Sequence, residues 1–438
     1  MDQLERSWSG EPEELAGSLR HAGEETVIFQ AGAGFDDGWA TRLAVDPRSV
    51  LSRPRDPADP LAPVRELESL LAGRRGTGGT ACTGVAVLAG YELLQGTVPR
   101  RPGPGLPDLH AWSVDDSFTR AGDSRWVLTS RHGKAGELER WFPSGQQPVE
   151  PGRPVTAGLV QAATSLPRER YLRSVDRIRS HILNGDVYQA NLTQRFSVSF
   201  TGEALGLYRN LTKRTPAPRS ALVACRRFAL ASVSPELFLS GVFGGAIRTG
   251  PIKGTRPRHE DPAADRAAAL ELRRSEKDHA ELLMIVDLMR NDLGRVCLPG
   301  SIEVPELAGL VTYPAVHHLV AKVAGRLDAT VTLPEILAAA FPGGSITGAP
   351  KKRAMEILRE LEPVERSFYT GSLLWFGDDG SFDSSILIRS VVLADGLAHL
   401  GAGGGIVADS DAEAEWMESN DKARAPAEVL GFIPEDAR

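Results

Sequence analysis

Apolar and polar residues alternate with two different periods in the second half of the chain, and each period predicts one kind of element. In the first segment the apolar residues recur at steps of four, three and four: Tyr171, Val175, Ile178 and Ile182. This spacing places them on one face of a helix, and the Asn184–Gly185 pair that follows is a typical helix end.

The next segment, VYQANLTQRFSVSF, alternates at period two and predicts a strand. One face is apolar and carries Tyr188, Ala190, Leu192, Phe196 and Val198. The opposite face carries a polar strip made of Gln189, Asn191 and Thr193.

Two later runs predict helices that carry carboxylates. The run SEKDHAELLMIVDLMRNDLG opens with Ser275 and Asp278 at capping-box spacing and ends at Gly294, with Glu281 lying beside its apolar stripe. The stripe contains Leu282, Ile285, Val286, Met289 and Leu293.

The second of these runs, SDAEAEWMESNDKA, opens with Ser410 and Glu413 at the same capping spacing. Acids and a lysine then follow on one side: Glu415, Glu418 and Lys422. Each acidic face fits a solvated surface. The alternative is a Mg2+ site, because this cation prefers carboxylate oxygens, but spacing alone does not bring the two helices together.

Glycine-containing stretches indicate turns. Asp-Asp-Gly and Ala-Asp-Gly separate apolar runs near the C-terminus, which predicts antiparallel hairpins and an α+β fold. LGAGGGIVADS does not match G-x-G-x-x-G, and GGSITGAPKK lacks G-K-[ST], so we interpret both as glycine loops without a nucleotide signature. Pro350 begins a helix after the second loop, where free N–H groups form either an ordinary cap or an anion site.

Two proline- and glycine-rich stretches, 98–108 and 142–156, have the composition of joints. We take the second as a boundary, which divides the chain into an N-terminal lobe, residues 1–150, and a second region, residues 151–438.

Composition narrows the possible functions. The 438 residues are 42% hydrophobic and 24% charged, and the net charge of -7 argues against a nucleic-acid partner. The absence of an 18-residue apolar run or a signal-like N-terminus argues against a membrane partner. Three scattered cysteines fit a reducing cytosol, so we expect a cytoplasmic protein.

The stretch GPIKGTRPR places Lys253 at the tip of a predicted loop. Most lysines are exposed, so this residue alone is more typical of a surface cation. His317 and His318 lack the spacing of a zinc site.

Many ordered stretches between Pro167 and Val429 resemble the chorismate-utilising enzymes, and most closely the aminodeoxychorismate synthase branch. They include GDVYQANLTQRF, SPELF, PIKGTRPR, EKDHAELLMIVDLMRNDLG, YPAVHHLV, FPGGSITGAPKKRAMEIL, GAGGGIVADS and EAEWMESNDKA. The resemblance implies layered antiparallel β-sheets flanked by helices, with the active site in a cleft between the layers.

The resemblance also implies a reaction. Lys253 would attack ring C2 of chorismate while Glu236 protonates the departing C4 hydroxyl, and ammonia would then add at C4 to give 4-amino-4-deoxychorismate. For this role the pKa of Lys253 must be lowered and that of Glu236 raised. Anthranilate synthases carry a small residue in place of Lys253. Isochorismate and salicylate synthases carry a water-activating lysine in place of Gln189.

Further roles follow from the same resemblance. Mg2+ would be held by Glu281 and Glu418 and would bind the ring carboxylate. The residues implied to act on the substrate, in addition to Lys253 and Glu236, are Gln189, Asn191, Thr255, His318, Gly348, Ala349, Tyr369, Arg389, Gly403, Gly405 and Lys422.

The chain differs from the family pattern at some positions, and these differences leave alternative functions open. Gly250 replaces a usual arginine, Leu374–Trp375 replaces a glycine-tyrosine pair, and the first 150 residues match weakly, without a clear tryptophan-sensing signature. No G-x-C-x-G glutaminase motif occurs, so a separate glutamine amidotransferase subunit would supply ammonia in a heterodimer. Anthranilate synthase component I and a catalytically silent chorismate-binding subunit are the alternatives, and the pathway served, folate or secondary metabolism, is open.

Overall fold

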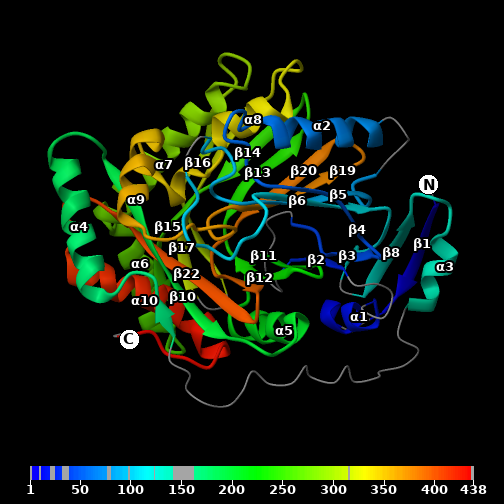
Figure 1. Cartoon of the computed structure of the whole chain (residues 1–438), viewed down its shortest axis with the longest axis horizontal. Coiled ribbons are helices and arrows are strands. Elements are labelled where there is room, and N and C mark those ends of the chain that lie inside the picture. Colours follow the sequence, from blue (N-terminus) through cyan, green and yellow to red (C-terminus); the bar gives the residue numbers. More distant parts are fainter. Residues whose placement is uncertain are drawn as a thin grey trace.

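The computed structural model describes residues 2–8, 11–19, 25–31, 39–75, 80–96, 99–122, 124–141, 162–313 and 316–435. Within these residues two antiparallel sheets pack face to face, and helices cover their outer faces (Figure 1). This agrees with the α+β architecture expected from the sequence. The expected boundary at 142–156 lies outside the described residues.

The first sheet has 12 strands in the described part of the chain. In spatial order they are β1 (Asp2–Ser7), β8 (Arg125–Ser130), β7 (Asp116–Arg120), β3 (Arg42–Val45), β2 (Thr26–Gln30), β11 (Arg219–Ala224), β12 (Phe228–Ser234), β21 (Ser390–Ala394), β22 (Leu397–Ile406), β10 (Gln189–Ser199) and β18 (Gly348–Ala349), with β9 (Ala163–Thr164) paired to β10.

The second sheet has 10 strands in the same described ranges. They are β15 (Ile252–Pro257), β17 (Val316–Arg326), β14 (Ala246–Gly250), β13 (Leu237–Val242), β20 (Ser381–Ile386), β19 (Ser372–Gly377), β5 (Gly84–Ala89), β6 (Leu109–Val114) and β4 (Arg48–Arg53), with β16 (Glu303–Thr312) paired to β17.

Three apolar layers hold the sheets and helices together. Side chains of β2, β5, β6, β12 and β19 fill the space between the sheets. The outer face of the second sheet packs against α2, α7 and α8, and that of the first against α1, α4, α5, α9 and α10. The helices are α1 (Pro12–Leu19), α2 (Ala62–Arg74), α3 (Ala135–Leu138), α4 (Arg168–Leu183), α5 (Ala204–Arg214), α6 (Pro262–Arg274), α7 (Glu276–Gly294), α8 (Leu333–Ala340), α9 (Lys351–Leu361) and α10 (Ala412–Val429), with 3-10 turns η1 (Glu139–Trp141) and η2 (Gly344–Ile346).

Both sheets combine strands from the two sides of residue 150. Strand β2 pairs with β11, and β5 pairs with β19. Residues 1–150 and 151–438 thus build both sheets together, and neither part forms a complete sheet without the other. The division at residue 150 stays a prediction. None of the helices in the described ranges is long and apolar enough to cross a membrane.

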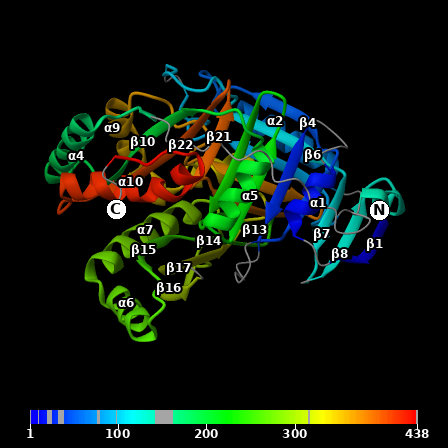
Figure 2. The same cartoon turned by 90° about the horizontal axis from the view of Figure 1, so that it is seen from below.

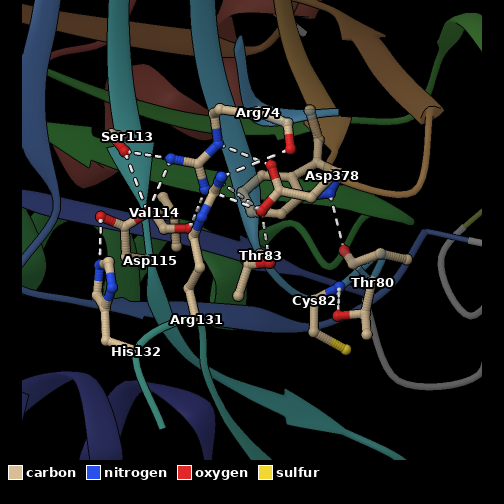
Figure 3. A network of polar contacts seen from close by, with 12 residues as sticks. Arg74, Thr80, Cys82, Thr83, Ser113, Val114, Asp115, Arg131, His132 and Asp378 are labelled. Carbon is tan, nitrogen blue, oxygen red and sulfur yellow. Dashed lines mark hydrogen bonds and ion pairs between the residues drawn. The ribbon is translucent and has the colours of Figure 1, made fainter. Parts of the chain in front are cut away.

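A buried ionic cluster joins the sheets at the end that carries β6 to β8 (Figure 3). The Asp378 carboxylate, after β19 of the second sheet, accepts hydrogen bonds from Arg74 at 2.7 and 3.0 Å, Arg131 at 3.1 Å and Thr83 at 2.7 Å. Arg74 also contacts Asp115 at 2.8 Å. Since Arg131 follows β8 of the first sheet, this Asp378 cluster ties the two sheets together.

Several local predictions hold. Helix α4 ends at Leu183, Ser275 caps α7 by accepting from the Asp278 N–H, and the predicted stripe of α7 is buried. The Ala-Asp-Gly turn joins β21 to β22 with Asp395 and Gly396 in the left-handed region, which suits a tight hairpin.

Other local predictions are wrong. Tyr188 is 71% exposed because it precedes β10 rather than belonging to its apolar face. Helix α10 is capped by Asp411, whose side chain accepts from the Ala414 N–H. Ser410 instead donates to Glu415 at 2.6 Å. The expectation for Pro350 holds, because it is the N-cap of α9 at the start of the expected helix.

The glycine-rich stretch LGAGGGI is strand β22 and not a loop. The strand contains so many glycines because neighbouring groups lie very close to its backbone. A Cβ at Gly401 would lie 2.3 Å from the Tyr369 ring. At Gly403 a Cβ would lie 2.2 Å from the Leu192 carbonyl oxygen. These glycines therefore keep a strand free of side chains where neighbours crowd it.

Candidate active site

A cavity of about 540 Å³ opens between β10, β22 and α10 on one side and β15, β17 and α7 on the other. Figure 2 shows these two groups of elements facing each other. Most of the residues predicted from sequence line this cavity: Asn191, Glu236, Lys253, Thr255, Glu281, His318, Tyr369, Arg389, Gly403, Gly405, Glu418 and Lys422. The structure thus brings together residues that are far apart in the chain.

Gln189, Gly348 and Ala349 lie just behind the cavity wall. Gln189 pairs with Ala349 where β18 adds to β10. The Gln189 side chain is fully buried, and neither its amide oxygen nor its amide nitrogen has a hydrogen-bond partner in the described part of the chain. A Cβ at Gly405 would lie 2.4 Å from Gln189 Nε2 and 3.5 Å from Lys253 Nζ, so both side chains reach the same glycine.

Lys253 belongs to strand β15, so the prediction of a loop tip is wrong. The pairing of β15 with β17 shifts between Lys253 and Thr255, at a bulge formed by Gly254. Gly254 has φ of +67°, and a Cβ there would lie 2.6 Å from Leu272 and 2.9 Å from Asp278. The bulge therefore requires glycine, and it sets the direction in which Lys253 enters the cavity.

Lysines accompany both predicted metal-binding carboxylates. Lys253 Nζ lies 3.7 Å from Glu281, and Lys277, one turn before Glu281 on α7, lies 3.9 Å from it. Lys422 lies 2.7 Å from Glu418 on α10. The charge of Lys422 lowers the pKa of Glu418 in spite of burial. Both carboxylates are thus arranged to face positive charge.

The two glutamates fit a Mg2+ ion. Their oxygens are the ligands this cation prefers, and they come from separate helices that line one cavity. The described ranges hold no group of three or more histidine, cysteine, aspartate or glutamate side chains placed for a metal. The protein would therefore offer two carboxylates and leave the other positions to substrate and water oxygens.

Glu236 precedes β13 and is 4% exposed. Burial raises its pKa to about 7, although the positive charge of Lys253 opposes this effect. One carboxylate oxygen has no hydrogen-bond partner within the described ranges. Near neutral pH this residue can therefore hold a proton in the cavity and release it.

His318 on β17 is a neutral imidazole at pH 7, because burial lowers its pKa to about 4. Its Nδ1 lies 3.0 Å from Thr255 Oγ1 and 3.1 Å from the Gly254 carbonyl oxygen. A carbonyl oxygen only accepts, so Nδ1 carries the proton and Nε2 is left as an acceptor.

Backbone donors of β22 face the cavity. The Gly403 carbonyl accepts a hydrogen bond from Lys422 at 3.2 Å, so it points away from β10. In an antiparallel strand the N–H and C=O of one residue point to the same side, so the Gly403 N–H also points away from β10. Gly405, two residues later, has the same orientation. Strand β21 pairs only as far as Leu400, so it does not cover the N–H groups of Gly403 and Gly405.

Arg389 and Tyr369 complete this end of the cavity. Arg389 has a left-handed backbone with φ of 51°, and burial lowers the pKa of its guanidinium. Burial also raises the pKa of Tyr369 above its usual range, so its hydroxyl stays neutral. The arrangement suits an anionic group, which a guanidinium, a hydroxyl and backbone N–H groups can bind together.

Sequence reasoning assigned no site role to several residues that line the cavity: Lys277, Asp278, Ser345 and Asp421. Glu415, named there only as part of an acidic helix face, lines it as well. Lys277 could have been found from helical spacing, since it lies four residues before the predicted metal-binding Glu281. For Ser345 the sequence offered no signal.

Comparison with known proteins gives the family. Residues 29–428 match the family model described as chorismate binding enzyme. The chain belongs to the chorismate binding enzyme family. Aminodeoxychorismate synthase component 1 of Klebsiella aerogenes is 48% identical over 317 residues, which cover 72% of this chain and 69% of that protein. The same protein of Salmonella typhimurium is 42% identical over 332 residues, 76% of this chain and 72% of that one.

Among solved structures, anthranilate synthase component I from Streptococcus pneumoniae matches this chorismate binding enzyme with a TM-score of 0.73 and 26% identity. The match covers 92% of each chain. The fold and the family expected from the sequence motifs are therefore confirmed.

Proposed function

We propose that this chorismate binding enzyme replaces the C4 hydroxyl of chorismate by an amino group and yields 4-amino-4-deoxychorismate for p-aminobenzoate biosynthesis. The observation that carries the proposal is the position of Lys253, whose amine enters the cavity 3.7 Å from Glu281. The names of the Klebsiella and Salmonella relatives support it.

Lys253 is the proposed nucleophile. Its neutral amine forms a bond to ring C2 as the two ring double bonds shift, and the C4–O bond breaks with its electron pair on oxygen. Glu236 gives its proton to that oxygen, so water leaves instead of hydroxide. The pKa of about 7 supports this role, because the carboxyl is partly protonated at neutral pH.

Ammonia completes the exchange. Its lone pair forms the C4–N bond, the double bonds shift back, and the C2–N bond to Lys253 breaks, which returns the lysine amine. One proton from the added nitrogen restores Glu236. The net change is chorismate plus ammonia to 4-amino-4-deoxychorismate plus water.

The ring carboxylate is proposed to lie at the end of the cavity where α7 and α10 meet it. Glu281 and Glu418 would hold Mg2+ there, and the bound ion would supply positive charge to this carboxylate. Lys422 stays beside Glu418 and donates to the Gly403 carbonyl, which fixes the position of both.

The enolpyruvyl carboxylate is proposed to be bound by a second group of residues that line the same cavity. Arg389, Tyr369 and the N–H groups of Gly403 and Gly405 would bind it. Asn191, Thr255 and His318 would then contact the ring from the sides, and Gln189, Gly348 and Ala349 would support the wall behind it. Their positions in or behind the cavity support these assignments.

Ammonia is proposed to come from a separate glutamine amidotransferase subunit that forms a heterodimer with this chain. The word "component" in the relatives' names supports a partner. We place the reaction in the cytosol, in keeping with the free thiols of Cys82, Cys225 and Cys297. The p-aminobenzoate formed by a further enzyme would enter folate synthesis.

Anthranilate synthesis is the second candidate function, and the solved anthranilate synthase component supports it through its fold. Lys253 argues against it, since that branch carries a small residue there. The test is to incubate the purified chain with chorismate, Mg2+ and ammonium salt and to separate the products with mass detection. We expect aminodeoxychorismate, which an added lyase converts to p-aminobenzoate. Anthranilate would refute the proposal, and tight binding of chorismate without a product would indicate a silent subunit.

A further inference from the structure

Arg366 is buried directly behind the cavity wall, with its side chain 2% exposed. It lies in the segment between α9 and β19, and its guanidinium stacks over the ring of Tyr91 at 4.4 Å. It does not line the cavity itself. Any effect of Arg366 on the substrate must therefore pass through the residues it touches.

The guanidinium donates hydrogen bonds to four other residues. Nη2 donates to the Asn191 carbonyl at 2.6 Å on β10, and Nη1 donates to the Ile346 carbonyl at 2.9 Å on η2. Nη1 also lies 3.4 Å from Thr370 Oγ1. Nε and Nη2 donate to both oxygens of Glu362, at the C-terminus of α9, at 2.8 and 2.6 Å.

These acceptors belong to the wall of the cavity or adjoin it. Asn191 and Ile346 line the cavity, and Thr370 follows Tyr369, which also lines it. The Asn191 N–H in turn donates to Thr347 at 2.9 Å, so β10 and the η2 loop are joined twice. One guanidinium thus connects the three segments that form this wall.

Glu362 fixes the other side of the arginine. It accepts from Arg366 and from both the N–H and the hydroxyl of Thr193, each at 2.9 Å. The backbone N–H groups of Arg366 and Ser367 donate to Glu92 of the N-terminal region at 2.7 and 3.0 Å. Glu362 thus holds the guanidinium of Arg366, and Glu92 holds its backbone.

The turn that carries Tyr369 depends on this support. Ser367 and Thr370 have φ of 57° and 60°, a left-handed conformation that costs a non-glycine residue energy. Such a turn persists only where its surroundings determine it. Contacts of Arg366 and Glu92 with Thr370 and Ser367 supply that determination.

We propose that Arg366 is a positioning residue that orients Asn191, Ile346 and Tyr369 toward the substrate. The proposal rests on the proposed function, because it assigns these residues to the binding of chorismate. Only arginine suits the position: its planar fork of five N–H donors reaches all the acceptors at once, whereas a lysine ammonium can pair with Glu362 but cannot span the two carbonyls.

The test compares Arg366→Lys and Arg366→Met with a matched variant, Arg55→Met. Arg55 is a buried arginine that pairs with Glu365 at 2.8 Å and contacts Asp108, neither of which lines the cavity. We expect all three variants to melt at a lower temperature than the wild type. We expect only the Arg366 variants to lose kcat/KM for chorismate in the ammonia assay, by about 10- to 100-fold and through both a lower kcat and a higher KM, since misplaced contacts impair binding and orientation.

A double-mutant cycle separates positioning from a loss of stability. Asn191→Ala removes one of the side chains through which Arg366 acts, so Arg366→Lys should reduce kcat/KM much less in this background than in the wild type. Fully additive effects would overturn the proposal, as would equal losses in kcat/KM for Arg55→Met and Arg366→Met. Wild-type kcat and KM in folded Arg366→Lys would overturn it as well.

A direct binding measurement distinguishes failure of the proposed function from failure of the positioning role of Arg366. If the wild type makes no aminodeoxychorismate, calorimetric titration with chorismate and Mg2+ still compares the wild type, Arg366→Lys and Arg55→Met. Weaker binding in Arg366→Lys alone supports the positioning role, and equal binding in all three refutes it.

Discussion

Replacing Glu236 by glutamine is expected to stabilise the protein at alkaline pH while it removes the proposed acid. Burial raises the pKa of Glu236 from 4.5 to about 7. Between these values the folded protein binds a proton at Glu236 that the unfolded chain does not bind, so stability falls as the pH rises through this window. The loss is complete above pH 7 and amounts to about 3 kcal/mol.

Glutamine has a similar shape but does not titrate. Near pH 5 the wild type keeps most of the proton, whereas at pH 8.5 its unfolding free energy should fall relative to Glu236→Gln by about 3 kcal/mol. Urea unfolding followed by tryptophan fluorescence at both pH values measures this difference. Glu303→Gln, at an exposed position, controls for the loss of a carboxylate.

Glu236→Gln should lower the activity of the enzyme, although it raises stability at alkaline pH. The kcat of the ammonia-dependent reaction should fall by about 10²- to 10⁴-fold, which is the usual contribution of a general acid. A stability difference between wild type and Glu236→Gln that is the same at pH 5 and 8.5 would refute the buried titration, and an unchanged kcat would refute the role of Glu236 as the acid.

Three further results are expected. Lys253→Ala should lose the ammonia-dependent activity and the covalent adduct with chorismate, and an adduct seen by intact mass in this variant would refute the nucleophile. Gly405→Ala brings a Cβ within 2.4 Å of Gln189 Nε2, so kcat should fall in steady-state assays, whereas an unchanged kcat would show that the wall adapts. Asp378→Asn removes the charge that Arg74 and Arg131, both half-buried, share and should lower stability by about 2–3 kcal/mol in urea unfolding, whereas exposed Asp379→Asn should have little effect.

Local elements could be predicted because their signals lie within about 20 residues. The apolar stripe of α7, the end of α4 and the hairpin between β21 and β22 all follow from spacing and turn chemistry. Glycine misled the prediction at β22 and at Gly254. In both places it permits close packing inside or beside a strand, and the local sequence cannot distinguish this from a loop.

The site could be predicted only with the help of the family resemblance. Glu281 and Glu418 lie on separate helices, and no local pattern indicates that these helices face one cavity. Spacing likewise gives no information on the burial of Glu236, which produces its raised pKa. Arg366 escaped notice because arginines are mostly exposed.

The interleaving of strands has a consequence for synthesis on the ribosome. Strand β5 ends at Ala89, but its partner β19 is complete only at Gly377. At roughly 5–20 residues per second, β5 waits on the order of 15–60 s for this partner. During that time the edge of β5 that pairs with β19 stays open, although β6 and α2 are already made. We therefore expect the nascent chain to depend on holdase chaperones, and fragments that end before β19 to aggregate.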